Sequence, residues 1–516
     1  MTNPQGPEGV LPSSSVAAEI AAGYATGGEA LELGAVVVGG QADPAMQVRI
    51  PLATVNRHGL IAGATGTGKT KTLQGIAEQL SAAGVPVVLA DVKGDLSGLA
   101  APGESGERVA QRAAETGMGN WAPQGFPVEF VSLGTKGIGV PIRATLTAFG
   151  PILLSKVLAL NATQESTLGL IFHWADGQGL PLLDLKDLRS VIQYLTGDQG
   201  KDDLKGIGGV SAQTAGVILR ALVNLEADGG DTFFGEPELD PADLVRTDAE
   251  GRGVITLFEL GDQAARPAMF STFLMWVLAD LFQTLPEVGD VDKPRLVFVF
   301  DEAHLLFKGA SKAFLDEVEQ TVKLIRSKGV GVFFATQLPT DIPNPVLSQL
   351  GARIQHALRA FTPEDQKALS KTVRTYPKTA AYDLESALTS LGTGEAIVTV
   401  LSERGAPTPV AWTRLRPPCS YMGDIGDQQV RARVESSPLQ GKYGQTVDRE
   451  SAYEMLAAKL AAAPEPDTAR PRRAEKPEPG MVEQIMGNSA VKSFMRSAAT
   501  AAGREISRSI FGTRRR

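Results

Sequence analysis

One octapeptide constrains what this chain can fold into more than any other feature. It reads Gly63-Ala64-Thr65-Gly66-Thr67-Gly68-Lys69-Thr70. The spacing matches the phosphate-loop pattern G-x-x-x-x-G-K-[ST], whose glycines let successive backbone N–H groups turn inward toward a polyphosphate. An apolar run, Gly59–Ala62, precedes the octapeptide, and a helical run, Thr72–Ala82, follows it. Because this strand–loop–helix order is the context the pattern requires, we predict nucleotide binding by residues 63–70.

The last two residues of the octapeptide carry its polar chemistry. Lys69 supplies a positive charge for the β and γ phosphates of a nucleotide. The hydroxyl group of Thr70 is an oxygen ligand of the kind that Mg²⁺ accepts. The sequence therefore predicts a magnesium–nucleotide site at the start of the helix.

Short apolar runs alternate with helical stretches over most of the chain. The runs are His58–Ala62, Val87–Asp91, Val128–Val131, Val254–Phe258, Leu296–Phe300, Val330–Ala335 and Ala396–Val400. Continuous apolar runs are typical of strands that are buried on both faces of a parallel sheet. We therefore predict an α/β fold with a mostly parallel sheet that is flanked by helices.

A pair of acids ends one of these runs. Asp301 and Glu302 follow Leu296–Phe300, the arrangement of a Walker B strand. We expect Asp301 to hold Mg²⁺ through water, and Glu302 to polarise the water that attacks the γ phosphate. A solvated Asp-Glu pair at a strand end is the alternative.

An amide ends another run. Gln337 follows the strand predicted at Val330–Ala335. If that strand lies beside the strands of the phosphate loop and the acid pair, Gln337 orients water or senses hydrolysis at the γ phosphate. The alternative is a polar residue that merely caps a strand.

Basic residues precede the same run, and Arg326 is our candidate for an arginine finger that reaches the nucleotide of a neighbouring subunit. Arg353 and Arg359 are weaker candidates for this role. The basic residues could also simply complement the negative end of a helix.

Composition shifts divide the 516 residues into segments. We expect a flexible leader at 1–30, a core formed by 31–142 and 252–416 with a β-hairpin near its start, and a helical insertion at 143–251. A polar segment and linker follow at 417–480, and a basic amphipathic helix at 481–516. From Arg470 to Arg516 eleven Lys and Arg stand against four Glu, a net charge of +7. Such a helix binds an acidic surface or packs on its own domain.

Composition also excludes several classes of protein. The one cysteine, Cys419, forms no internal disulfide, and together with only four histidines it argues against a Cys/His metal cluster. A net charge of -8 argues against a protein that coats DNA. We interpret the apolar stretch Ala268–Leu285 as a buried helix, because it contains Asp280 and Gln283, and we expect a cytoplasmic protein without a signal peptide.

Together these motifs resemble the HerA/FtsK branch of P-loop ATPases. Within it the chain is most similar to the YjgR type, which has HerA-like helicase C-terminal domains. The resemblance runs from residue 30 to about 420. It rests on Asn56–Thr70, Asp91-Val92-Lys93-Gly94-Asp95, Leu158–Glu165, Asp301-Glu302-Ala303-His304 and Ala335-Thr336-Gln337-Leu338-Pro339.

The resemblance implies a RecA-like core, Mg²⁺-dependent ATP hydrolysis and a homo-hexameric ring that moves duplex DNA through its pore. It casts Lys69 and Thr70 as nucleotide ligands, Asp301 as the Mg²⁺ acid, Glu302 as the catalytic base and Gln337 as the sensor. HerA proper also has an N-terminal β-barrel domain that helps to dock a nuclease partner. About 55 residues precede Asn56, where the motif region begins, too few for a full barrel, so the resemblance does not extend to that partner.

Two other functions stay open. One is an ATPase that acts on a substrate other than DNA, such as a protein-remodelling or membrane-associated motor that the basic tail recruits. The other is a nucleotide-bound assembly scaffold. The presence of both Lys69 and Glu302 argues against a scaffold, because a scaffold has no need of a catalytic base.

Overall fold

The computed structural model describes residues 13–462, apart from 92–93, 205–207, 228, 260–266 and 290. Residues up to Lys459 form one compact unit. The second unit begins at Leu460, and the structure describes it only as far as Ala462. The basic helix predicted at 481–516 lies outside the described residues.

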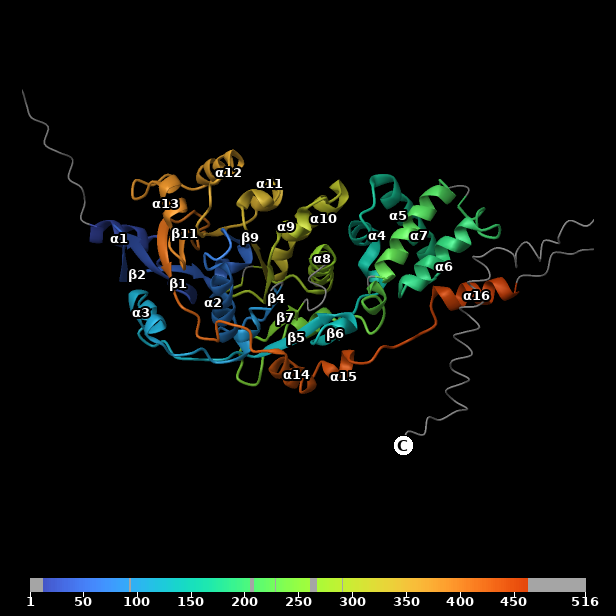
Figure 1. The fold of residues 1–516 in the computed structure, drawn as a ribbon, viewed down its shortest axis with the longest axis horizontal. Helices are drawn as coiled ribbons and strands as arrows, with labels where there is room; N and C mark the ends of the chain where they lie inside the picture. The colour runs from blue at the N-terminus through green and yellow to red at the C-terminus, as the bar shows by residue number, and fades with distance from the viewer. Residues whose placement is uncertain are drawn as a thin grey trace, which may run out of the picture. The chain divides into compact units, whose positions relative to one another are not determined.

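A sheet of 12 strands runs through the described part of the first unit (Figure 1), in the order β2-β1-β12-β11-β10-β3-β9-β8-β4-β7-β5-β6. The strands are β1 (Ala30–Val38), β2 (Gln41–Pro51), β3 (Gly59–Ala62), β4 (Val87–Asp91), β5 (Val128–Leu133), β6 (Val140–Ile142), β7 (Ile255–Glu259), β8 (Leu296–Phe300), β9 (Val330–Thr336), β10 (Ala352–Gln355), β11 (Glu395–Thr399) and β12 (Ala411–Leu415). From β10 to β6 all neighbours are parallel, whereas β2, β1, β12, β11 and β10 pair antiparallel.

The apolar runs of the sequence form the centre of this sheet. Every residue of β3, β4, β7, β8 and β9 is buried, as expected for strands that are covered on both faces. The prediction of a mostly parallel α/β sheet and of a hairpin near its start is confirmed. The run at Ala396–Val400 was expected among the parallel strands, but β11 is antiparallel to both of its neighbours.

Helices flank the sheet (Figure 1). They are α1 (Ser13–Ala22), α2 (Lys69–Ala82), α3 (Glu107–Glu115), α4 (Leu146–Val157), α5 (Ala162–Gly177), α6 (Leu185–Thr196), α7 (Ala212–Ala227), α8 (Pro267–Thr284), α9 (His304–Phe307), α10 (Lys312–Leu324), α11 (Asn344–Leu347), α12 (Pro363–Val373), α13 (Leu384–Ser390), α14 (Asp427–Glu435), α15 (Gln440–Tyr443) and α16 (Ala452–Ala462). α8 is the buried helix expected from the sequence, with Phe273, Val277 and Leu281 fully buried. No helix of the described residues is long and apolar enough to cross a bilayer.

Between β6 and β7 the described chain forms the four helices α4–α7 and short 3₁₀ turns, with isolated bridges but no strand. Asn161 and Asp184 cap α5 and α6 with reciprocal capping boxes, which explains where these helices begin. The assignment of this stretch to a separate insertion stays a prediction.

Two segments are more ordered than their composition indicated. Residues 1–30 were expected to be a flexible leader, but Ser13–Ala22 forms α1, which buries Ala17 and Ile20. The Tyr24 hydroxyl donates to the carbonyl of Val398 at 2.8 Å and is fully buried. The leader prediction is therefore wrong for residues 13–30, because α1 packs against β1 and β2 and Tyr24 bonds to a residue far along the chain.

Residues 417–480 were expected to be a polar segment and linker. In the part that belongs to the first unit, 417–459, the chain instead binds to the rest of that unit through side-chain hydrogen bonds. Arg143 donates to the carbonyl of Tyr443 at 3.0 Å, and the amide of Tyr453 donates to Asp187 at 2.9 Å. We call residues 417–459 the strap. The linker prediction fails there because these polar contacts, together with buried side chains such as Val430 and Leu456, hold the segment in place.

Candidate active site

The phosphate loop connects β3 to α2, at the carboxyl end of the parallel strands. Gly68 precedes α2 with φ 109°, a left-handed conformation that favours glycine. A Cβ atom on Gly63 would lie 2.5 Å from the Cβ of His356, so this position has no room for a side chain. The glycines of the motif are thus required by backbone conformation and by close packing.

Lys69, the first residue of α2, is buried beneath the loop. Its Nζ atom donates to the carbonyl of Gly63 at 2.6 Å and to that of Ala64 at 3.2 Å. The first intrahelical bond of α2 runs from the Thr72 amide to the Gly68 carbonyl, so the preceding N–H groups face the loop. A helix N-terminus with an ammonium group beside it is a site for polyphosphate.

The strand order brings the other predicted residues to the same edge of the sheet. β9 lies between β3 and β8. The amide of Gly63 donates to Thr336 at 3.2 Å, and the amide of Ala303 donates to Ala335 at 2.8 Å. The end of β9 is therefore hydrogen-bonded on one side to the phosphate loop and on the other to the turn that follows Asp301 and Glu302.

Glu302 has an unusual backbone. Its φ of 47° is rare for a residue with a side chain, and only 8% of its surface is exposed. The Glu302 amide donates to the Asp301 carboxylate at 2.9 Å, and one Glu302 carboxylate oxygen lies 3.4 Å from Nδ1 of His304. Such backbone strain costs about 1–3 kcal/mol and concentrates at functional sites, which makes Glu302 a candidate for a functional role.

Gln337 lies at the end of β9 with an exposed side chain. Asp341 binds both sequence neighbours of Gln337, since its carboxylate accepts from the Thr336 hydroxyl at 2.7 Å and from the Leu338 amide at 3.0 Å. Gln337 thus follows a strand that lies between β3 and β8, as the prediction for this residue requires.

Arg326 lies at the opposite edge of the sheet, in a 3₁₀ turn (Ile325–Lys328) just before β9. The length of β9, at about 3.3 Å per residue, places it about 20 Å from the edge with the phosphate loop. Arg326, Arg353, Arg57 and Lys323 line one groove of about 590 Å³. The chain's own phosphate loop is therefore out of reach of Arg326.

Arg359 differs from the other two candidate arginines. Its guanidinium donates to the carbonyl of Thr65 at 3.3 Å, so it lies beside the phosphate loop of its own chain. Arg353 shares the groove of Arg326. Of the three arginines, Arg359 thus lies at the chain's own phosphate loop, whereas Arg326 and Arg353 lie at the opposite edge of the sheet.

Acidic residues end the strands on the other side of β8. Asp91 accepts from the amides of Gly94 and Leu96 at 2.7 and 2.8 Å and thereby fixes the turn after β4. Val92 and Lys93 lie outside the described residues. Burial, together with Asp91, Asp424 and Asp427, raises the pKa of Glu259 to about 7.

This pKa leads to a pH-dependent prediction. Because the folded pKa of Glu259 exceeds the usual 4.5, the folded state loses stability as pH rises from about 4.5 through 7. Glu259→Gln should therefore raise the free energy of unfolding by about 2 kcal/mol at pH 8, allowing for partial solvent contact, and have little effect at pH 5. Urea unfolding at both pH values tests this, with the exposed Glu364→Gln as control. An equal effect at both pH values would contradict the assignment.

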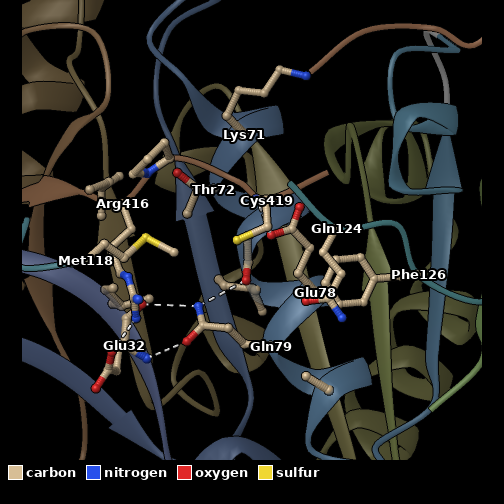
Figure 2. A pocket seen from close by; sticks show the side chains of 16 residues that line it. Glu32, Lys71, Thr72, Glu78, Gln79, Met118, Gln124, Phe126, Arg416 and Cys419 are labelled. Carbon is tan, nitrogen blue, oxygen red and sulfur yellow. Dashed lines mark hydrogen bonds and ion pairs between the residues drawn. The ribbon is translucent and has the colours of Figure 1, made fainter. Parts of the chain in front are cut away.

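The strap is hydrogen-bonded to α2, the helix that follows the loop. Glu78 accepts from the amides of Cys419 and Ser420, each at 2.8 Å, and Gln74 donates to Ser420 at 2.6 Å and to Tyr421 at 2.8 Å. A small cavity of about 150 Å³ lies beside these contacts. Figure 2 shows the side chains that line it, with Gln79 bonded to the backbone of Glu32. The helix that carries Lys69 is therefore held on one side by β1 and on the other by the strap.

Other neighbours of the loop were not predicted. His356 follows β10, and the Gly394 amide before β11 donates to the Thr67 carbonyl at 3.0 Å. Arg112 donates to the Gly394 carbonyl at 3.1 Å and so supports that contact. No motif marks these residues, because each reaches the loop only through tertiary packing.

Comparison with protein families agrees with this geometry. The profile of the helicase HerA-like C-terminal family matches residues 38–516. The chain belongs to this family. A search of curated proteins finds no match.

This chain is also similar to solved structures, and one of them has a TM-score above 0.5. The plasmid coupling protein TrwB in complex with ADP and Mg²⁺ is 15% identical over 78% of this chain and 98% of its own, with a TM-score of 0.51. VirB4 of Thermoanaerobacter pseudethanolicus is 14% identical over 76% and 97%, with a TM-score of 0.49. At this identity the likeness to TrwB establishes the fold alone, which is a RecA-like P-loop fold.

Proposed function

We propose that this member of the HerA-like family hydrolyses ATP with Mg²⁺ and couples hydrolysis to the movement of duplex DNA, as a homo-hexameric ring. One observation carries the proposal: the phosphate loop, the acid pair and Gln337 end three adjacent parallel strands, β3, β8 and β9, at one edge of the sheet. The ADP and Mg²⁺ bound in TrwB, whose fold this chain shares, support the choice of nucleotide and metal.

The residues fit these ligands. When ATP binds, its phosphates replace the carbonyls of Gly63 and Ala64 as partners of the Lys69 ammonium. The Thr70 hydroxyl and the Asp301 carboxylate supply hard oxygen ligands for Mg²⁺, which neutralises charge on the β and γ phosphates. Glu302 accepts the proton of the attacking water, and Gln337 orients that water.

Arg326 acts in this proposal on the nucleotide of the neighbouring subunit. Its place in the groove with Arg353, at the edge away from its own loop, supports a role across an interface between subunits. A head-to-tail ring would bring this edge of one subunit to the loop edge of the next.

Complementation tests the role of Arg326. Arg326→Ala and Lys69→Ala should each be nearly inactive, because one lacks the finger and the other lacks the loop cation. Mixed at equal amounts, they should recover activity, since roughly one quarter of the interfaces in a random ring then pair an intact loop with an intact finger. Hydrolysis by the mixture, compared with each variant alone, is the measurement. No recovery in mixed rings would assign Arg326 to its own subunit or to another role.

DNA coupling is tested by steady-state ATP hydrolysis at low salt, with and without linear duplex DNA. We expect DNA to stimulate hydrolysis several-fold, and we expect the stimulation to fade with added salt as counterions compete for the phosphates. The rate without DNA at each salt concentration is the control. Hydrolysis that ignores DNA would favour an ATPase with a protein or membrane substrate, and no hydrolysis would favour a nucleotide-bound scaffold.

A further inference from the structure

His356 lies directly beneath the phosphate loop and is fully buried. Its amide donates to the Ala62 carbonyl at 2.7 Å, which extends the pairing of β10 with β3 up to the first residue of the loop. The next residue, Ala357, accepts from the Ala64 amide at 2.9 Å. The backbone of His356 and Ala357 is thus hydrogen-bonded to the chain where the loop begins.

The side chain of His356 fills the space under both ends of the loop. A Cβ atom on Gly63 would lie 2.5 Å from the His356 Cβ, and one on Gly68 would lie 3.7 Å from its Cε1. His356 therefore lies under the first glycine of the loop with its Cβ and backbone, and under the last glycine with its imidazole ring. A smaller residue here would leave a void beneath the backbone that must present its N–H groups to phosphate.

One hydrogen bond connects this ring to α2. Nε2 of His356 lies 3.0 Å from the Thr72 hydroxyl, which also lies 3.2 Å from the Gly68 carbonyl. Thr72 completes the first turn of α2, three residues after Lys69. The ring thus links the end of β10 to the start of the helix, across the base of the loop.

The charge state of the His356 ring also suits its position beside Lys69. Burial, and then the positive charge of Lys69, lower the pKa of His356 to about 4. At neutral pH the imidazole is uncharged, so it supports the loop without competing with Lys69 for a phosphate anion.

We propose that His356 is a positioning residue, which holds the phosphate loop in its nucleotide-accepting shape through Thr72 and by packing under Gly63 and Gly68. It touches no phosphate and takes no part in the chemical step. The inference rests on the proposed ATP site. His356 lies outside the phosphate-loop motif, so the motif alone does not include every residue that supports the loop.

The test separates nucleotide affinity from turnover. His356→Ala should raise the KM for ATP about five- to tenfold, because it removes one buried hydrogen bond and the packing of the ring. The kcat should stay within about twofold of the wild type. His356→Gln, whose amide can reach Thr72, should recover most of the affinity. Thr72→Val should also raise KM, and the double variant should be no worse than His356→Ala alone, because both residues act through one contact. His173→Ala, at an exposed position on α5, is the matched control.

The outcomes are distinct. Wild-type protein that binds no ATP would refute the proposed function and with it this role. ATP binding by the wild type together with an unchanged KM in His356→Ala, or with additive effects in the double variant, would refute the role of His356 alone. If His356→Ala does not fold, the KM values of His356→Gln and Thr72→Val decide, since both keep the site filled. Normal KM in Thr72→Val would then overturn the proposal.

Discussion

Lys69→Ala is expected to reduce ATP hydrolysis by about 100- to 1,000-fold and to remove measurable ATP binding. The reason is the position of the Lys69 ammonium, which is buried under the loop and held by the carbonyls of Gly63 and Ala64. Alanine leaves the N–H groups of the loop but removes the only cation of the motif itself. Binding of a fluorescent ATP analogue and steady-state hydrolysis are the measurements.

The control for this variant is Lys367→Ala, which removes the same charge at an exposed position of α12. It should behave as the wild type in both assays. Circular dichroism and thermal melting of Lys69→Ala must match the wild type, so that lost binding reports on the site rather than on the fold. Retained ATP binding by a folded Lys69→Ala would place the nucleotide elsewhere.

The local features of the sequence were enough to predict the centre of the sheet. The runs Val87–Asp91 and Leu296–Phe300 match β4 and β8 residue for residue, because strands buried on both faces are apolar almost throughout. The phosphate loop was equally clear, since its function depends on consecutive residues. The acid pair follows directly from β8.

Other elements depend on partners that are distant in the chain. β10 has only four residues, and β12 alternates buried and partly exposed positions around Trp412 and Arg414, so neither formed a continuous apolar run. α1 is rich in small residues, and its burial depends on packing against β1 and β2, while Tyr24, which follows the helix, bonds to Val398 far along the chain. No local pattern encodes such a pairing.

The same reason explains what was missed around the site. His356 lies 287 positions after Lys69 in the chain, yet it packs under the phosphate loop that contains Lys69. The strap reaches α2 through Glu78, a helical residue that would ordinarily be exposed and is here buried with its carboxylate bonded to Cys419 and Ser420. A buried carboxylate without a nearby motif becomes visible only when its partners are placed in space.

Glu302→Gln should separate ATP binding from hydrolysis. Glutamine has the size of glutamate but cannot accept the proton of the attacking water, so hydrolysis should fall by about 100- to 1,000-fold while ATP still binds. The strained backbone at φ 47° belongs to the turn after β8, and a side chain of the same shape leaves that turn unchanged. Equilibrium binding of labelled ATP and single-turnover hydrolysis measure the two steps separately.

Glu364→Gln, at an exposed position in the first turn of α12, is the matched control and should hydrolyse ATP at the wild-type rate. Undiminished hydrolysis by Glu302→Gln would exclude Glu302 as the base and move attention to Asp301, the other acid of the pair. Loss of ATP binding together with hydrolysis would instead assign Glu302 a role in holding the nucleotide. Only the combination of normal binding with slow hydrolysis supports a base at the end of β8, and that combination would also show that the loop and the acid pair act on the same phosphate.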